Sequence, residues 1–358
     1  MGLALLATAD HHVPLLHDTY PGNQPDAPTF SGLTERIVLR CREITRGLEH
    51  VTVVFDKGNN SQDNLDAVEA APFHFVGSLV ATQHPDLLAI ERSAMAPLDE
   101  HGLPGVRSWR TDKKVFGRPR TVVVTFNENL FVAQARTLLR EISKRQRNLR
   151  ELQARLDRWR SAAARGRRPT VSGVRKKVSA WLAARHMKTL FEVEVSERDG
   201  LPALSYRFAE EAWAELQKTL LGKTILFTDN DDWSDAEIVR AYRSQYEVEE
   251  GFRDMKDPHH IALRPQRHWT DQKIRVHVLM CVIALMLLCL LRRELAEHGI
   301  LCSIPRMVNE LSGIKEIVMA FPPAPGKRSP VLRTSLSALS EEQRQMYDVL
   351  NLARFIAV

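Results

Sequence analysis

The spacing of hydrophobic residues changes along the chain and predicts both strands and helices. Residues 51–55 form a continuous apolar and mostly β-branched run, which is typical of a central strand buried on both faces. Residues 2–8 and 13–17 predict two short strands around a polar turn that contains His11 and His12. Together with the helical segments below, these strands indicate an α/β fold of the mixed α+β type. Further strands are predicted at 74–80, 191–195, 204–208, 222–228 and 316–321.

Two segments predict long helices of different character. In 127–165 apolar residues recur every three or four positions, which is the period of an amphipathic helix. The run 278–291 is almost entirely apolar and ends at Arg292. It is shorter than the roughly 18 to 20 residues that cross a bilayer, so we expect a buried core helix and no membrane partner. The apolar stripe of the first helix comprises Val132, Ala135, Leu138, Leu139, Ile142, Leu149, Leu152 and Leu156.

A third helix is predicted from a start signal near residue 234. Ser234 and Glu237 form an S-x-x-E capping box, and no proline follows until Pro258, which predicts one helix of about six turns. The acidic cluster 229–232 just before it suits turn and helix-dipole roles better than a metal site. One face of the helix carries titratable and polar groups instead of an apolar stripe: Tyr242, Gln245, Glu249 and Lys256.

Two interpretations of this polar face remain open on spacing alone. It is either a solvent-exposed face with ion pairs between successive turns, or a column of functional groups. Asp56 raises the same question, because it directly follows the strand 51–55. A carboxylate at the carboxyl end of a strand is common in active sites, but the following Gly58-Asn59-Asn60 loop equally suits a turn or N-cap aspartate.

The polar face resembles a signature of the DDE transposases of bacterial insertion sequences. Their Y-x2-R-x3-E-x6-K subgroup matches Tyr242, Glu249 and Lys256, while Gln245 stands where the family has arginine. Three further segments resemble the family in the same order along the chain: 20–26 (Y-P-G-N with Asp26), 53–61 (V-V-F-D-K-G-N-N-S) and 263–277.

The resemblance implies an RNase H-like core built from two separated parts of the chain. The parts would be 1–85 and 222–320, with an insertion at 86–221 that is mostly helical with some strands. Residues 321–358 would add a Pro-rich linker and a C-terminal helix that opens with a second capping box at Ser340.

The resemblance also implies metal-dependent phosphoryl transfer on DNA. Asp56 and Glu249 would be the second and third carboxylates of the site, which holds two Mg²⁺ or Mn²⁺ ions when complete. Tyr242, Gln245 and Lys256 would contact phosphates at the transposon ends. Gln245 offers a hydrogen bond but lacks the bidentate positive fork of arginine.

The first carboxylate of the family has no counterpart that we can assign. Asp10, Asp18 and Asp26 lie on the wrong segments, since the family places this residue on a strand before the one matched by 2–8. We therefore expect a chain truncated at its N-terminal strand, with an exposed sheet edge and poor or absent strand transfer.

Charge supports a polyanionic partner. The formal net charge is +6, and the region 136–177 is strongly basic with few acidic residues. A solvent-exposed helix face usually mixes both signs, so this one-sided charge favours contact with the DNA backbone. The residues that we select for this contact are Arg145, Arg147, Arg167, Arg168, Lys176 and Lys177.

Two functions therefore compete. The chain is either a transposase that acts as a homodimer on double-stranded DNA, at the transposon ends and the target, or a non-catalytic DNA-binding protein dominated by its basic helix. The four cysteines form no C-x-x-C pair, and no export signal is recognised, so we expect a cytoplasmic bacterial protein associated with the nucleoid.

Overall fold

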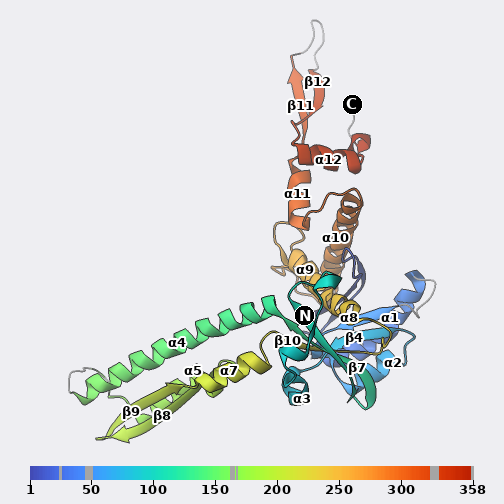
Figure 1. Cartoon of the computed structure of the whole chain (residues 1–358). Coiled ribbons are helices and arrows are strands. Elements are labelled where there is room, and N and C mark those ends of the chain that lie inside the picture. The colour runs from blue at the N-terminus through green and yellow to red at the C-terminus, as the bar shows by residue number, and fades with distance from the viewer. Residues whose placement is uncertain (24–25, 45–50, 162–165, 167, 323–329, 356–358) are drawn as a thin grey trace. The chain divides into compact units, whose positions relative to one another are not determined.

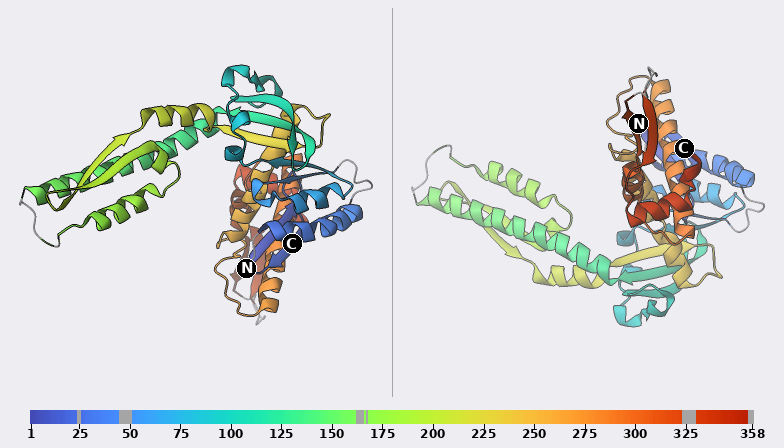
Figure 2. Two further views of the ribbon diagram at one scale, coloured as in Figure 1. Left: turned by 90° about the horizontal axis from the view of Figure 1, so that it is seen from below. Right: turned by 90° about the horizontal axis from the view of Figure 1, so that it is seen from above.

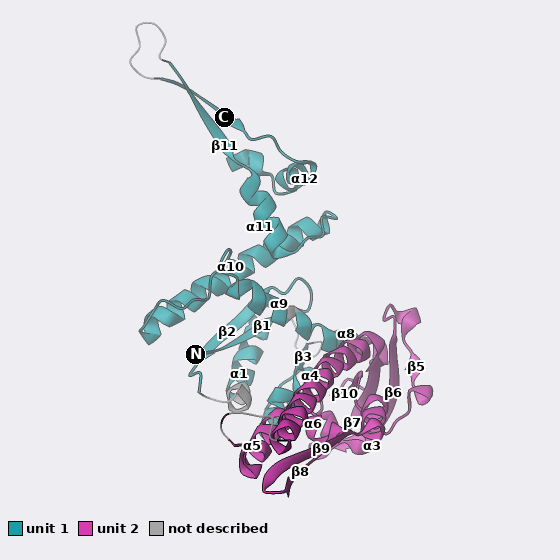
Figure 3. Ribbon diagram, turned by 90° about the vertical axis from the view of Figure 1, so that its left-hand side faces the viewer, with its two compact units in different colours: residues 1–75, 240–358 teal, residues 76–239 magenta. Residues whose placement is uncertain are grey.

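A computed structural model describes residues 1–23, 26–44, 51–161, 166, 168–322 and 330–355. The chain forms two compact units, one made of residues 1–75 and 240–358 and the other of residues 76–239 (Figure 3). The chain thus leaves the first unit after Phe75 and returns to it at Arg240. The two units divide within β4 (His74–Ser78) and within α8 (Asp235–Arg243).

The first unit begins with the predicted β-hairpin. Strands β1 (Gly2–Ala7) and β2 (Pro14–Tyr20) pair antiparallel, with Leu3 opposite Thr19. His11 and His12 have positive φ angles of 59° and 55°, which confirms that they are turn residues. The guanidinium of Arg292 lies 3.1 Å from Nδ1 of His12 and also donates to the His11 carbonyl. This contact ties the hairpin turn to the helix that carries Arg292.

After the hairpin come the long helix α1 and the strand that precedes Asp56. These elements are α1 (Asp26–Ile44), β3 (Thr52–Phe55), η1 (Lys57–Asn59), α2 (Gln62–Glu69) and β4 (His74–Ser78). β3 pairs with β4 at one end of a sheet, and Phe55 stacks on Phe75 at 5.8 Å. The prediction of a central strand buried on both faces is wrong, since Val53 and Phe55 are buried but Val54 is only half-buried beside a cavity.

The helices α9 (Gln245–Lys256) and α10 (Asp271–Glu297) form the core of the first unit together with β1. Met255 on α9 packs in one buried cluster with Val278 and Leu285 of α10, and Leu3 and Leu5 of β1 lie against it. The prediction that α10 is a buried core helix is only half right, because several of its large apolar side chains are exposed. Among the described residues, α10 is the helix that is long and apolar enough to cross a membrane, by length and composition alone.

The C-terminal part of the first unit is a small helix and hairpin module. Its elements are α11 (Ile304–Gly313), β11 (Glu316–Phe321), β12 (Val331–Leu336), α12 (Glu341–Val349) and η5 (Leu352–Phe355). The Ser340 capping box is confirmed. The segment predicted as a Pro-rich linker instead connects two antiparallel strands, because β12 pairs with β11 along its whole length. Residues 323–329 between them lie outside the described residues.

The second unit contains an antiparallel sheet in the order β4-β10-β7-β6-β5. Strands β6 and β7 come from the segment predicted as an insertion, so part of that segment extends the sheet. The elements here are η2 (Ala81–Gln83), α3 (Pro85–Leu88), η3 (Arg92–Ala94), β5 (Ala96–Pro97), η4 (Asp99–His101), β6 (Val106–Val115), β7 (Arg118–Asn127) and β10 (Lys223–Thr228).

A long arm extends from β7 in the second unit, and its longest element is α4 (Glu128–Arg160), capped by the Asn127 side chain. α4 runs beside a helix and a β-hairpin in both Figure 1 and Figure 2. Leu149 and Leu156 of α4 are fully buried in the arm's core. Val132 and Leu139, predicted on the same stripe, are exposed instead. The arm continues with α5 (Val171–Leu182), α6 (Met187–Leu190), β8 (Phe191–Arg198), β9 (Leu201–Phe208) and α7 (Glu210–Thr219).

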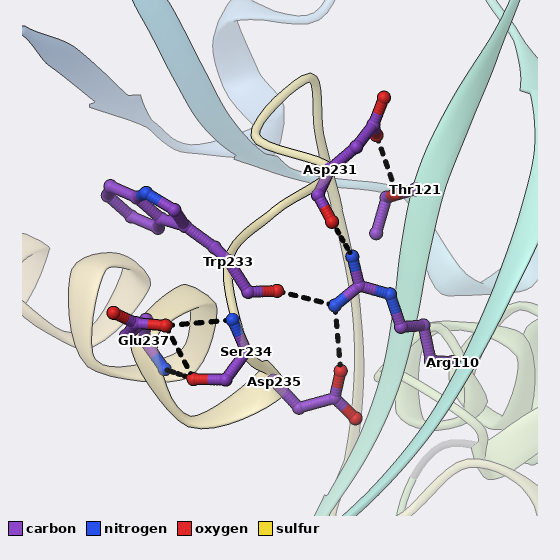
Figure 4. A network of polar contacts seen from close by, with 7 residues as sticks. All are labelled: Arg110, Thr121, Asp231, Trp233, Ser234, Asp235 and Glu237. Carbon is purple, nitrogen blue, oxygen red and sulfur yellow. Dashed lines mark hydrogen bonds and ion pairs between the residues drawn. The ribbon is translucent and has the colours of Figure 1, made fainter. Parts of the chain in front are cut away.

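The acidic cluster 229–232 belongs to a polar network that fixes the end of β10 (Figure 4). The Arg110 guanidinium donates to the carbonyls of Asp231 and Trp233, both at 2.6 Å, and approaches the Asp235 carboxylate at 3.3 Å. Thr121 donates to the Asp231 carboxylate at 2.7 Å. These contacts give Asp231 of this cluster a structural role, while the helix-dipole role of the cluster stays a prediction.

Candidate functional site

Asp56 stands at the end of β3 with its side chain exposed. Its backbone, at φ −84° and ψ 161°, forms the N-cap of η1, and its carbonyl accepts from the Asn59 amide at 2.9 Å. The carboxylate, however, makes no capping hydrogen bond. The backbone of Asp56 therefore fits the turn interpretation, while its carboxylate makes contacts outside the turn.

One group that reaches this carboxylate is Tyr242, which lies far away in the sequence. Its hydroxyl donates to Oδ1 of Asp56 at 3.3 Å. Tyr242 stands on α8 (Asp235–Arg243), whose start is the predicted capping box: Ser234 N donates to Glu237 Oε2 at 2.8 Å, and Glu237 N donates to Ser234 Oγ at 3.3 Å. The polar face of the helix is thus joined to the end of β3, which the sequence alone did not establish.

The predicted six-turn helix is interrupted at Ser244, between α8 and α9. The Ser244 hydroxyl donates to the Ala241 carbonyl at 2.7 Å, so it competes with the helical backbone pattern. The backbone of Ser244 nevertheless keeps right-handed helical angles, φ −61° and ψ −15°. Helical backbone angles therefore continue from the end of α8 through Ser244 into α9.

A cavity of about 480 Å³ lies beside this column, within the first unit. Asp56, Gln245 and Glu249 line it, and β1, β2, β3, α1 and α9 supply its apolar walls. The exposed carboxylates of Asp56 and Glu249 thus share one hollow, although they come from distant parts of the chain. Carboxylates that open on one cavity offer hard oxygen donors to a cation.

Gln245 contributes an unsatisfied polar group to this cavity. Its Nε2 atom is buried and has no hydrogen-bond partner among the described residues. Buried amide groups are nearly always hydrogen-bonded, so an unpaired one that lines a cavity points to a ligand or an ordered water. An amide donor at this place suits the oxygen of a phosphate or a carboxylate.

Asp18 also lines the cavity, a feature that the sequence analysis missed. Its carboxylate pairs with Arg36 at 2.9 Å and accepts from the Thr19 amide at 3.0 Å. The alternation of β2 was the available signal, because it places Leu16, Asp18 and Tyr20 on one face of the strand. Burial lowers the pKa of the neighbouring His17, and the Arg36 charge lowers it further.

Lys256 occupies the far end of the column. It lies with Glu249 and Phe252 in a second, open hollow of about 630 Å³, and its ammonium group is 5.6 Å from the centre of the Phe252 ring. Glu249 lines both hollows. The structure therefore places Asp56, Gln245 and Glu249 around one cavity, with Tyr242 hydrogen-bonded to Asp56. Lys256 lies next to Glu249 in the second hollow.

The residues at the cavity fit a divalent cation in their chemistry, although they form an incomplete ligand set. Asp56 and Glu249 supply the oxygen donors that Mg²⁺ and Mn²⁺ prefer. Within the described residues, no group of three histidine, cysteine, aspartate or glutamate side chains is arranged to hold a metal ion. The pair can therefore contribute to a metal site that needs further donors.

The basic residues predicted to contact DNA fall on the arm of the second unit. Arg147 is exposed and lines an open hollow of about 670 Å³ on α4, together with Arg136, Arg140 and Lys144. Arg145 differs, because its side chain is only 12% exposed and pairs with Glu141 at 2.8 Å. Arg145 thus pairs with a glutamate of its own helix. The excess of basic residues in the sequence did not reveal this pairing.

The remaining basic residues lie beyond α4. Arg168 donates to the Gly200 carbonyl at 3.0 Å, which fastens it to the turn between β8 and β9. Lys176 and Lys177 are exposed on α5, and the Lys177 ammonium lies 5.0 Å from the Trp181 ring centre. Arg167 lies outside the described residues.

Comparison with known families gives one match. The family model described as Transposase DDE domain matches residues 1–287 of the 358, which include Asp56, Tyr242 and the whole of α9. Among curated proteins, no sequence matches this chain.

Proposed function

Since this chain belongs to the family of transposases with a DDE domain, we propose that it is the transposase of a bacterial insertion sequence. The proposed activity is metal-dependent cleavage of DNA strands at the ends of the element, followed by strand transfer. The observation that carries the proposal is that Asp56 and Glu249 line one cavity, with Tyr242 hydrogen-bonded to Asp56.

Each residue of the column has a proposed role. Asp56 and Glu249 would hold divalent ions, Mg²⁺ or Mn²⁺, which activate an attacking hydroxyl and stabilise the leaving oxygen in phosphoryl transfer. Tyr242 orients the Asp56 carboxylate through its 3.3 Å hydrogen bond. Gln245 donates its unpaired amide to a phosphate oxygen, and Lys256 provides a positive charge beside Glu249.

This assignment places the chain in the Y-x2-R-x3-E-x6-K subgroup with one replacement. Glutamine at 245 keeps a donor toward the phosphate but gives up the charge of arginine, so we expect weaker contact with the transposon end. The two assigned carboxylates are also fewer than the three of a complete DDE site. For that reason we expect strand transfer by this chain alone to be weak.

The proposed partner is double-stranded DNA, held by the basic arm. Arg136, Arg140, Lys144 and Arg147 offer four exposed positive charges along one hollow of α4, a spacing suited to successive phosphates. In the proposed synaptic complex two copies of the chain act together. A transposase of this kind works on chromosomal DNA, so we propose a cytoplasmic location at the nucleoid.

Binding of Mn²⁺ tests the proposal without depending on turnover. We expect Asp56→Asn and Glu249→Gln each to weaken Mn²⁺ binding, measured by calorimetry, and to abolish any metal-dependent cleavage of DNA that carries the element's ends. DNA affinity in the absence of metal should remain. Asp63→Asn is the matched control, since Asp63 is an exposed carboxylate on α2.

The same experiment distinguishes a transposase from a non-catalytic DNA-binding protein. A non-catalytic DNA-binding protein would bind DNA through its arm, and neither Asp56→Asn nor Glu249→Gln would change Mn²⁺ binding relative to the Asp63 control. That result would overturn the proposed metal site and leave DNA binding as the function that the basic arm supports.

A further inference from the structure

Helix α10 is apolar on two opposite faces, and the described residues of the chain cover only one of them. The covered face contains Val278, Cys281, Leu285 and Cys289, all buried in the core of the first unit. These residues recur every three or four positions and account for the packing of the helix. A helix that serves only as one wall of a core would be polar on its other face.

The other face of α10 carries a continuous apolar stripe. Val276, Met280 and Leu287 are 54%, 58% and 54% exposed, and Ile283 and Leu290 between them are half-buried. Their positions alternate by three and four residues, which is the spacing of a seam between two paired helices. Leu279 and Leu291 widen the stripe and are also exposed. Exposed apolar stripes of this length mark interaction sites.

Charged residues of opposite sign stand at the two ends of the stripe. Lys273 continues the three-and-four spacing at the N-terminal end, and Glu294 continues it at the C-terminal end, both exposed. Glu294 lies 3.9 Å from His298 on its own helix. Near it, Arg293 pairs with Glu297 at 3.5 Å, which offsets that arginine's charge. The stripe is therefore positive at its start and negative at its finish.

We propose that this stripe docks antiparallel against the same stripe of a second copy of the chain. In that arrangement Lys273 of each copy approaches Glu294 of the other, so one pairing creates two equivalent charge contacts around a twofold axis. A parallel arrangement would instead place like charges together. The apolar positions from Val276 to Leu291 then meet along about 24 Å of helix.

The chemistry of the helix argues against a bilayer as the occupant. Although the whole helix is long enough to cross a membrane, its exposed apolar stripe from Val276 to Leu291 is about 24 Å long, which is shorter than the roughly 30 Å hydrocarbon core. One face of the helix is also already packed against protein in the first unit. The inference deepens the proposed function, because it names the surface that joins the two copies, but it needs neither metal nor DNA for its test.

The oligomeric state of the full chain, measured by light scattering without DNA or metal, tests the surface. We expect the unmodified chain to be a dimer and Leu287→Glu to shift it to a monomer with an unchanged circular-dichroism spectrum. Leu139→Glu is the matched control, because Leu139 is a similarly exposed leucine on α4, and it should remain a dimer.

A charge exchange then tests the antiparallel direction. Lys273→Glu places glutamate against Glu294 of the other copy, and Glu294→Lys places lysine against Lys273, so each should weaken the dimer at least tenfold. The double variant restores opposite charges and should recover most of the affinity. Failure of the double variant to recover would overturn the antiparallel pairing.

Two further outcomes would overturn the proposal as a whole. One is an unmodified chain that stays monomeric at the highest protein concentration that light scattering can measure. The other is a chain that floats with vesicles of neutral lipid and loses that binding with Leu287→Glu, which would assign the stripe to a membrane. A dimer that depends on Leu287 while the Asp56 and Glu249 variants bind Mn²⁺ normally would uphold the surface and reject only the metal site.

Discussion

The two longest helices of the described residues, α4 and α10, both expose large apolar side chains. The residues that neighbour these side chains differ between the two helices. On α4 the exposed Val132 and Leu139 alternate with Arg136, Arg140 and Lys144 around one open hollow. On α10 the exposed stripe contains no charge between its two ends. Both helices bury their opposite face in an apolar core. The difference that bears on their partners therefore lies in the exposed faces.

This comparison shows that exposure of apolar residues does not by itself identify a partner. The arginine and lysine side chains of α4 extend past the apolar residues, so a polyanion can be bound while the aliphatic stems cover Val132 and Leu139. On α10 no long polar side chain stands within the stripe to do the same, and the stripe requires another apolar surface.

The largest effect is expected at the buried face of α10. Leu285 is fully buried, so Leu285→Ala should lower the free energy of unfolding of the first unit by about 2–5 kcal/mol, through lost contacts and a cavity. Leu287→Ala, two positions away but exposed, should change monomer stability by less than about 0.5 kcal/mol. Denaturant unfolding of both variants at a concentration below dimer formation measures the difference. Equal losses would mean that Leu287 is covered within its own chain.

The matching pair on α4 should give a similar contrast, confined to the arm. Leu149→Ala removes a fully buried side chain of the arm's core and should cost about 2–4 kcal/mol, whereas Leu139→Ala should cost little. Hydrogen exchange should locate the loss in α4, α5 and the β8–β9 hairpin. Protection lost equally in α9 or α10 would contradict the division into two units.

The exposed face of α4 should govern the salt dependence of DNA binding. Replacing Arg136, Arg140, Lys144 and Arg147 together with glutamine should reduce the slope of log affinity against log salt concentration by about 3–4, since each phosphate contact contributes roughly 0.9. Fluorescence anisotropy with duplex DNA at several salt concentrations measures the slope. The control replaces Arg207 and Lys218, which are exposed but paired with Glu192 and Glu91. An equal change in the control would mean that overall charge, and not this face, sets the affinity.

The sequence predicted helix ends correctly where a local interaction between residues close in the chain determines them. The Ser234 and Ser340 capping boxes and the start of α4 are local, and all are confirmed. The break at Ser244 was missed because its cause is a single hydroxyl that bonds to the preceding turn. Whether β3 is central or terminal depends on strands elsewhere in the chain, which an apolar run cannot reveal.

The candidate site was predicted less completely than the fold. Helical spacing placed Tyr242, Gln245 and Glu249 on one face, but their meeting with Asp56 depends on tertiary packing and rested on family resemblance. Asp18 was dismissed by its position in the sequence, although β2 turns it toward the same cavity. The exposure of the α10 stripe also escaped prediction, because an apolar sequence carries no sign of which face its own core will cover.

The smallest effect is expected where α10 holds the hairpin turn, through His12. Burial, and secondly the charge of Arg292, lowers the pKa of His12 to about 4, while the nearby Glu250 and Asp10 oppose this shift and His11 adds to it. Because the folded state resists protonation, the contribution of His12 to stability is complete above the unfolded pKa near 6.5 and is lost as the pH falls from there toward 4.

His12→Asn keeps a side chain that tolerates the positive φ angle and can still accept from Arg292, but it cannot titrate. The unmodified chain should therefore lose more stability than the variant between pH 7.5 and pH 5, by an amount that solvent screening of this partly exposed ring keeps small. Urea unfolding at the two pH values measures the loss of stability. If the unmodified chain and His12→Asn lose the same amount, His12 is protonated as readily in the folded chain as in the unfolded one, and its contact with Arg292 does not favour a neutral imidazole.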